Sequence, residues 1–284
     1  MRILSHYTTK AAFLAILLTA CGPQAAREQT SREQAMEDTQ ATDSDTAAKD
    51  CFDPSPYTAS DSPDGVFNAY KTTGKISIDA CMQEQDWAKA NWQAMSFAWM
   101  GDPPAQEDYR GRFKVAWDQN YLYILVEVQD DTLTPTLASG VENYWKGDYV
   151  EVFIDEDRSG GDHKFNHQAF AYHVSTEGHA IDQSTQERAI FFDEHVEVTR
   201  AQQGDTYLWE MAIKLYDDTF DEEAKDNQPV VLQEGKEIGF SIAYGDNDGQ
   251  NTRENFMGSK AAHGLNNDEG YINADVFGKL TLNP

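Results

Sequence analysis

Basic residues are scarce in this 284-residue chain. It has 22 Lys and Arg against 49 Asp and Glu, so its formal net charge is −27. A surface with this excess of carboxylates repels phosphate backbones, which excludes nucleic acid as a partner. The same excess favours divalent cations and neutral molecules as ligands.

No hydrophobic run is long enough to cross a bilayer. The apolar run at 11–20 has about ten residues where a span needs about twenty. It follows Arg2 and Lys10, and this order predicts a secretory signal peptide over residues 1–20. The ending Leu18-Thr19-Ala20-Cys21 resembles the bacterial lipoprotein cleavage box, which implies that Cys21 is lipidated. The resemblance implies an outer-membrane lipoprotein that faces the periplasm or the exterior; an ordinary signal peptide is the alternative.

Cysteine occurs only three times. In an oxidising compartment, a disulfide between Cys51 and Cys81 is the simplest expectation, and two buried thiols are the alternative. With Cys21 lipidated and the other two paired, no cysteine is left for nucleophilic catalysis. The chain also lacks a nucleophile elbow and a zinc signature, so we expect a protein that is not an enzyme.

Large apolar side chains are almost missing between residues 22 and 50, where Met36 is the only one. Such a segment cannot bury enough surface to fold. We therefore expect a disordered acidic tether over residues 21–69, starting at the lipidated Cys21, and a folded domain over residues 70–284.

Short alternating segments dominate the rest of the chain. They predict strands, because apolar side chains at every second position give a strand one buried face. Helix is expected only at 86–94 and near 217–224. Many short strands joined by Gly and Asp turns favour an all-β sandwich. The expected strands are 112–117, 121–128, 149–155, 169–175, 196–200, 207–213, 238–244 and 279–282.

The segment 149–155 has an unusual pattern. Val150, Val152 and Ile154 share one face, while Glu151 lies on the other with Asp155. The turn that follows adds three more acids among glycines. Like charges this close need a cation, a basic partner or solvent.

The order of these segments resembles the family 9 carbohydrate-binding modules. The resemblance implies a jelly-roll-like antiparallel β-sandwich that binds the ends of oligosaccharides or polysaccharides between aromatic rings, with calcium held structurally. The chain departs from the family at Asp79-Ala80, which lacks the usual glycine, and after Arg253, where the usual tryptophan is absent. The matching segments are 76–80, 86–90, 114–118, 122–124, 128–131, 145–155, 207–210, 239–242 and 247–248.

Sugar binding requires flat apolar rings and planar polar groups. Trp99, in an expected loop over residues 98–104, and Trp145 are the candidate stacking rings; core packing is the alternative for each. Asn247, Arg253 and Phe256 are the candidate rim groups, with turn formation and a salt bridge as their alternative. For calcium, the expected oxygen ligands are Asp131, Asp148, Glu151 and Asp155; solvated acids are the alternative.

The expected function is non-catalytic glycan capture at a membrane, in support of carbohydrate catabolism. The first alternative is a sandwich lipoprotein that binds a protein partner or scaffolds an outer-membrane complex, having lost the sugar site. The second is haem binding, for which His195 or Met211 are candidates. Metal binding is also considered at three histidines spaced by six residues: His167, His173 and His179. They would share one face only if the strand that carries them were continuous.

Overall fold

The computed structural model describes residues 51–53, 55–261 and 269–284, which belong to one compact unit, Ala47–Pro284. The expected signal peptide, Cys21 and the first part of the expected tether lie outside these residues. In the described part of the chain, no helix is both long and apolar enough to cross a membrane.

The described residues form an all-β fold, as expected from the alternating segments. Three short 3-10 helices accompany the strands: η1 (Thr136–Ser139), η2 (Val141–Asn143) and η3 (Ala274–Val276). The strands are β1 (Val66–Lys71), β2 (Gln93–Ala94), β3 (Phe97–Met100), β4 (Tyr109–Trp117), β5 (Leu122–Asp130), β6 (Tyr149–Asp155), β7 (Phe170–Ser175), β8 (Ala180–Gln183), β9 (Ala189–Phe191), β10 (Val196–Gln203), β11 (Thr206–Ile213), β12 (Glu237–Asp246), β13 (Asn255–Gly258) and β14 (Gly278–Asn283).

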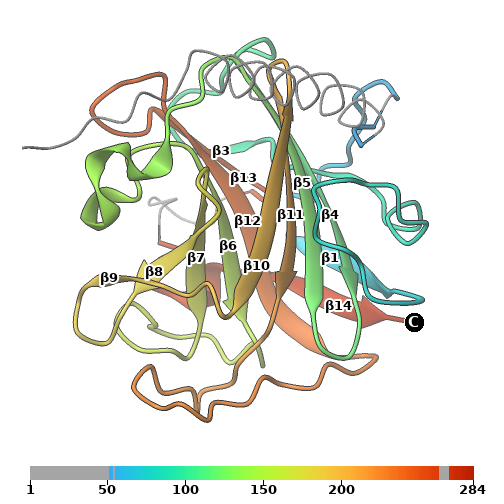
Figure 1. The fold of residues 1–284 in the computed structure, drawn as a ribbon, viewed down its shortest axis with the longest axis vertical. Helices are drawn as coiled ribbons and strands as arrows, with labels where there is room; N and C mark the ends of the chain where they lie inside the picture. The colour runs from blue at the N-terminus through green and yellow to red at the C-terminus, as the bar shows by residue number, and fades with distance from the viewer. Residues whose placement is uncertain (1–50, 54, 262–268) are drawn as a thin grey trace, which may run out of the picture. The chain divides into compact units, whose positions relative to one another are not determined.

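The strands pair in one continuous path that folds over on itself (Figure 1). Its order is β10-β11-β5-β4-β1-β14-β12-β6-β7-β8-β9, with β2 on β4, and with β13 pairing with both β12 and β3. Most neighbours are antiparallel, as expected; β1 departs from this because it runs parallel to both β14 and β4. β1 therefore joins the two layers of the sandwich.

The main core lies between these layers. Tyr244 of β12 packs its ring on Tyr109 of β4, with centroids 5.5 Å apart, and on Trp209 of β11 at 6.0 Å. Val150 and Val152 of β6 enter the same core, as the alternation in this strand predicts. All seven residues of β6 are buried, so the face that carries its carboxylates is covered as well.

The segment before residue 93 covers the outer face of β5 and β11. Phe52 and Trp87 are buried there, and a disulfide joins Cys51 to Cys81. The buried Glu210 of β11 accepts hydrogen bonds from the indole of Trp87 at 2.8 Å and from two backbone amides. The domain therefore begins earlier than the expected boundary at residue 70, because apolar side chains from residue 52 onward are packed on the sheet.

The expected helices are wrong. Residues 86–89 form turns, residues 93–94 form β2, and the segment 217–224 contains turns and irregular backbone. In the first segment Trp87, Ala90 and Trp92 are buried, and in the second Phe220 and Ala224 are half-buried. These few apolar side chains do not form the periodic face that a helix would need.

Candidate functional site

A pocket of about 390 Å³ opens on the outer side of β6, β7 and β8. We call it the Trp145 pocket. Strands supply its floor, and the loops before β6, before β7 and near the C-terminus supply its rim. Its lining residues are Tyr144, Trp145, Glu151, Lys164, Phe165, His173, Gln183, Glu187, Arg253 and Tyr271.

Three exposed aromatic rings surround this pocket. Trp145 is 38% exposed, and Phe165 and Tyr271 are each 37% exposed. The Trp145 ring rests edge-on against buried Tyr144, with centroids 5.2 Å apart. The Lys164 ammonium lies 5.1 Å from the Phe165 centroid and 5.0 Å from the Tyr271 centroid, which ties the two rings together. The pocket thus has flat apolar surfaces of the kind that stack on a pyranose ring.

The floor of the pocket is polar and buried. Glu151 of β6 points its carboxylate at the His173 imidazole of β7, with Oε2 and Nε2 3.2 Å apart, because these residues are paired in register. Arg253 donates to the Tyr149 hydroxyl and packs its guanidinium on the Phe256 ring at 4.2 Å. Burial, with the nearby charge of Arg253, lowers the pKa of His173 to about 3, so this imidazole is uncharged near neutral pH.

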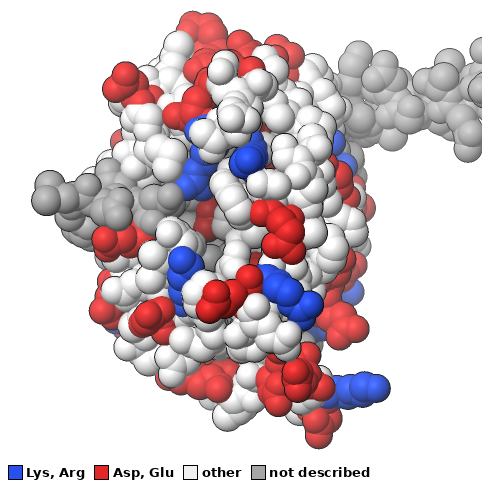
Figure 2. Space-filling model, turned by 90° about the vertical axis from the view of Figure 1, so that its left-hand side faces the viewer, with Lys and Arg blue, Asp and Glu red and all other residues white. Residues whose placement is uncertain are grey.

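Basic side chains gather at a few places on the side of the molecule shown in Figure 2, on a surface that is otherwise acidic or uncharged. Two basic residues, Lys164 and Arg253, line the Trp145 pocket together with Glu151 and Glu187. The Gln183 amide donates to the Tyr144 hydroxyl at 2.9 Å. The pocket therefore offers both donors and acceptors, which suits a ligand with many hydroxyl groups.

The structure separates the five sugar-binding candidates. Trp145 and Arg253 line the pocket, and Phe256 is buried behind Arg253. Asn247 is buried elsewhere, where its backbone amide donates to Asp148. These positions correct the expectation that Asn247 and Phe256 lie at the rim.

Trp99 is not in a loop as expected, because it belongs to β3. Its ring packs on Phe256 and Phe153, with centroids 5.4 and 5.9 Å away, and its indole N–H donates to the Lys260 carbonyl at 2.8 Å. A Cβ on Gly258 would stand 1.9 Å from this ring, so only glycine admits it. Trp99 therefore takes the alternative role, that of a packing residue.

Sequence reasoning missed much of the pocket wall, including Lys164, Phe165, Gln183 and Tyr271. The available signal was weak: Phe165 and Tyr271 are single large aromatic residues in turn-rich segments that lack strand alternation. His173 was considered, but as part of a histidine series. Instead, His173 contacts Glu151, while His167 and His179 contact Glu222 and Asp193.

A second group of carboxylates lies at the start of β6 and the ends of β5 and β12. Asp130, Asp148 and Asp246 are buried, with one oxygen of each within 4.8 Å of the others. Asp108, Asp131 and Asp248 form a second such set, which is more exposed. We call the two sets together the aspartate cluster.

The aspartate cluster has the chemistry of a calcium site. Asp148 accepts hydrogen bonds from the amides of Thr134 and Asn247, and Asp130 accepts one from the Tyr244 hydroxyl at 2.6 Å. Asp246 Oδ2 is buried without a hydrogen-bond partner among the described residues. Burial and then the neighbouring carboxylates raise the pKa of Asp148 to about 9 and that of Asp246 to about 8. Several hard oxygen atoms that repel one another fit a divalent cation.

The expected calcium ligands divide among three places. Asp131 and Asp148 belong to the aspartate cluster, Glu151 lies in the Trp145 pocket, and Asp155 accepts from the Gly160 amide at 2.8 Å. A strand rises about 3.3 Å per residue, so positions 148 and 155 lie roughly 20 Å apart and cannot share an ion. The expectation of one site from all four is therefore wrong.

A segment of 45 residues, 16% of this chain, is 47% identical to endo-1,4-beta-xylanase A of Thermotoga maritima, and it spans only 4% of that enzyme. A family 9 carbohydrate-binding module of Caldicellulosiruptor kristjanssonii has the same fold in its complexes with cellotriose and with glucose. The cellotriose complex gives a TM-score of 0.57 at 18% identity, over 77% of this chain and 93% of that one. The glucose complex gives 0.55 at 19%, over 76% and 95%.

The family model described as "Carbohydrate family 9 binding domain-like" matches residues 78–284, most of the chain. This match agrees with the resemblance seen in the order of the strands. The chain therefore belongs to the carbohydrate family 9 binding domain-like family, whose members bind carbohydrate without catalysis.

Proposed function

We propose that the Trp145 pocket binds the end of an oligosaccharide or polysaccharide. The observation that carries the proposal is the enclosure of one cavity by three exposed aromatic rings above a buried polar floor. Trp145 stacks on the sugar ring, and Arg253, Gln183 and Glu151 exchange hydrogen bonds with its hydroxyls. Phe165 and Tyr271 line the same pocket and take the stacking role of the tryptophan that is absent after Arg253.

The affinity should be modest. Stacking and hydrogen bonding to an uncharged, well-hydrated ligand give dissociation constants in the micromolar to millimolar range, about −8 to −4 kcal/mol. Isothermal titration of the full chain with glucose, cellotriose, xylotriose and mannotriose measures this. Trp145→Ala should abolish the binding that this pocket contributes. Tyr70→Ala removes a ring of matching exposure on β1 and should leave binding unchanged. Equal affinities for the two variants would refute sugar binding at the Trp145 pocket.

We also propose that the aspartate cluster holds calcium. Its support is the buried, mutually repelling carboxylates together with the unpartnered Asp246 oxygen. When bound, the ion would neutralise these carboxylates, and Asp130, Asp148 and Asp246 would hold it. Asp148 precedes Tyr149 and Glu151, so the ion would keep the start of β6 in place beneath the pocket. Titrating calcium into chain treated with EDTA, with magnesium as the comparison, tests the proposal; an absence of calcium-specific heat would refute it.

We further propose that Cys21 carries a lipid and that the domain serves as an outer-membrane receptor. It would capture glycan fragments for enzymes and transporters on other chains. The support is the sequence 18–21 after its short apolar run. Cys21→Ser should move the protein from the membrane fraction to the soluble fraction. If the variant stays in the membrane fraction, the lipid anchor is disproved.

A further inference from the structure

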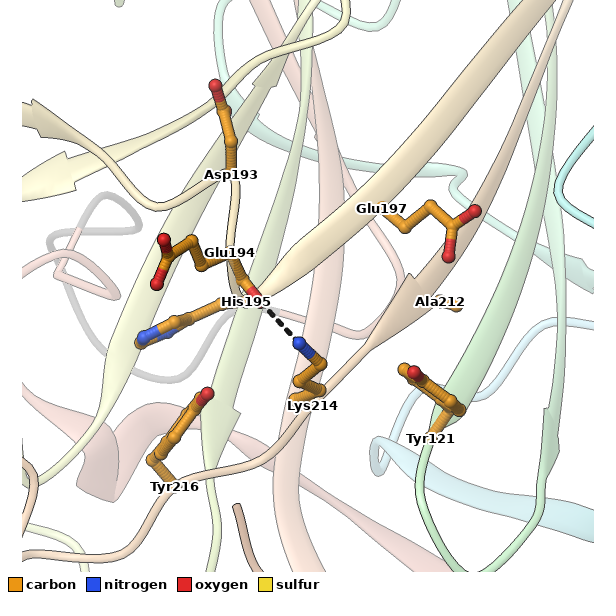
Figure 3. Close-up of a pocket in the computed structure, with 8 residues that line it drawn as sticks. All are labelled: Tyr121, Asp193, Glu194, His195, Glu197, Ala212, Lys214 and Tyr216. Carbon is orange, nitrogen blue, oxygen red and sulfur yellow. Dashed lines mark hydrogen bonds between the residues drawn. The ribbon is translucent and has the colours of Figure 1, made fainter. Parts of the chain in front are cut away.

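A second hollow, of about 440 Å³, lies between the turn before β5, the start of β10 and the end of β11 (Figure 3). Tyr121, Glu197, Lys214 and Tyr216 are among its lining residues. Among the residues that the structure describes, none lines both this hollow and the Trp145 pocket. A ligand here would therefore bind through its own set of contacts.

Two tyrosine rings stand on either side of Lys214 in this hollow (Figure 3). Tyr216 stacks on the buried His195 imidazole, with centroids 4.1 Å apart and planes at 29°, and contacts Phe220 at 5.1 Å. His195 is itself held by the Tyr172 hydroxyl, 2.8 Å from its Nδ1. The Tyr216 ring is thus backed by packed rings, so binding a ligand on it costs little side-chain entropy.

The polar groups around the two tyrosines include both donors and acceptors. The Lys214 ammonium donates to the Glu194 carbonyl at 3.0 Å, and Lys75 lies 3.9 Å from Glu197. Residues with carboxylate, ammonium and phenol groups therefore line one hollow. A site for a cation needs only hydrogen-bond acceptors, and a site for an anion needs only donors. Sugar hydroxyls both donate and accept, so a sugar suits a hollow that offers both kinds of group.

The hollow continues past Tyr216. A neighbouring cavity of about 630 Å³ shares Tyr216 and His195 with it and extends over Phe220 to Phe191, which is 49% exposed. We call the two cavities together the Tyr216 groove. Its combined volume and its exposed or half-buried rings suit more than one sugar unit, since pockets of about 300 Å³ or more already hold a small ligand.

We propose that the Tyr216 groove is a second carbohydrate-binding site, specific for neutral oligosaccharides. It needs no contribution from the Trp145 pocket. Because the two sites lie on one chain, a long polysaccharide that occupies both would be held more tightly than either site alone would hold it.

Native gel electrophoresis tests this, with the full chain run through gels that contain hydroxyethylcellulose, xylan, galactomannan or laminarin. The set comprises wild type, Trp145→Ala, Tyr216→Ala, the double variant, and Tyr70→Ala as the exposed-tyrosine control. Each single variant should still be retarded by at least one polysaccharide, with an apparent Kd tenfold or more above that of wild type. The double variant should migrate as it does in a gel without polysaccharide.

Two results would refute carbohydrate binding at the Tyr216 groove. One is that no polysaccharide retards the Trp145→Ala chain, and the other is that the Tyr216→Ala chain behaves like Tyr70→Ala. The Trp145 pocket fails separately, if Trp145→Ala is retarded as strongly as wild type. Tyr121→Ala, on the other wall, repeats the test without touching the packing on His195. Thermal melting of each variant checks that it is folded. If no polysaccharide retards any of the chains, carbohydrate binding is refuted at both sites.

Discussion

Glu151 and Asp148 lie three residues apart, yet they belong to sites of different kinds. Glu151 faces a neutral imidazole and shares its pocket with Arg253 and Lys164. Asp148 faces the carboxylates of Asp130 and Asp246. One acidic segment thus supplies one carboxylate to the Trp145 pocket and another to the aspartate cluster. The partners that other strands bring decide the chemistry of each carboxylate.

Asp148→Ala should give the largest effect. A ligand at a thousand times its Kd adds about 4 kcal/mol to the free energy of unfolding. We expect wild type to gain this increment from calcium and the variant to lose it, as measured by thermal melts with calcium and with EDTA. Asp155→Ala is the matched control, since Asp155 lies outside the cluster, and it should keep the increment. An equal loss in both variants would contradict the division of the acids.

Arg253→Ala should weaken sugar binding tenfold to a hundredfold. A hydrogen bond from a charged group contributes about 1.5–3 kcal/mol, and the guanidinium also supports the Tyr149 hydroxyl at the pocket floor. Titration calorimetry with the sugar that wild type binds measures the change. Arg158→Ala removes an exposed arginine that pairs with Glu237 and should bind like wild type. An unchanged Kd for Arg253→Ala would place the ligand elsewhere.

His173→Phe should flatten the dependence of stability on pH. The pKa of His173 in the folded chain is about 3, below its ordinary value of 6.5, because the imidazole is buried. The folded state therefore resists protonation, and stability present above pH 6.5 is lost as the pH falls toward 3. Between pH 6.5 and 5 this loss is about 2 kcal/mol in wild type.

Urea unfolding at several pH values measures that loss, and the difference between wild type and variant isolates His173 from the other groups. His179→Phe introduces the same phenyl ring at an exposed histidine side chain and is the matched control for the substitution itself. The assignment of a buried, neutral imidazole to the pocket floor is wrong if His173→Phe keeps the full pH dependence.

Lys164→Gln should have the smallest effect, about a threefold rise in Kd. Its ammonium holds the Phe165 and Tyr271 rings, and contacts of this kind contribute about 0.5–1 kcal/mol. Calorimetry at low and high salt measures it, and a neutral sugar should show little salt dependence in either protein. A tenfold loss, or a strong salt dependence, would indicate an acidic sugar instead.

Local pattern predicted the strands best where the alternation was long. The segments 112–128, 149–155 and 207–213 correspond to β4 and β5, β6 and β11. Most strands that escaped prediction are short: β2 has two residues, β9 has three, and β3, β8 and β13 have four each. The six-residue β1 was also missed, because it lies largely in the expected tether. A strand of two or three residues is too short to show an alternating pattern. It forms because a neighbouring strand has backbone N–H and C=O groups that are free to pair.

The candidate site was only partly predictable. Trp145 was identified from its place before the acidic strand, and Arg253 from the family resemblance. Phe165 and Tyr271 reach the same cavity from loops that are more than a hundred residues apart in the chain. Trp99 was misassigned because its Gly and Pro neighbours suggested an exposed loop, whereas Gly258 on a paired strand makes room for its ring to pack against the sheet.

The sequence by itself determined the strand periodicity, the acidic surface and the supply of aromatic and carboxylate side chains. Those features depend on neighbours in the chain and on composition. The tertiary structure alone decided which carboxylates meet an imidazole and which meet one another. Strand register sets those pairings: β6 places Glu151 opposite His173, and the ends of β5 and β12 bring Asp130 and Asp246 to Asp148.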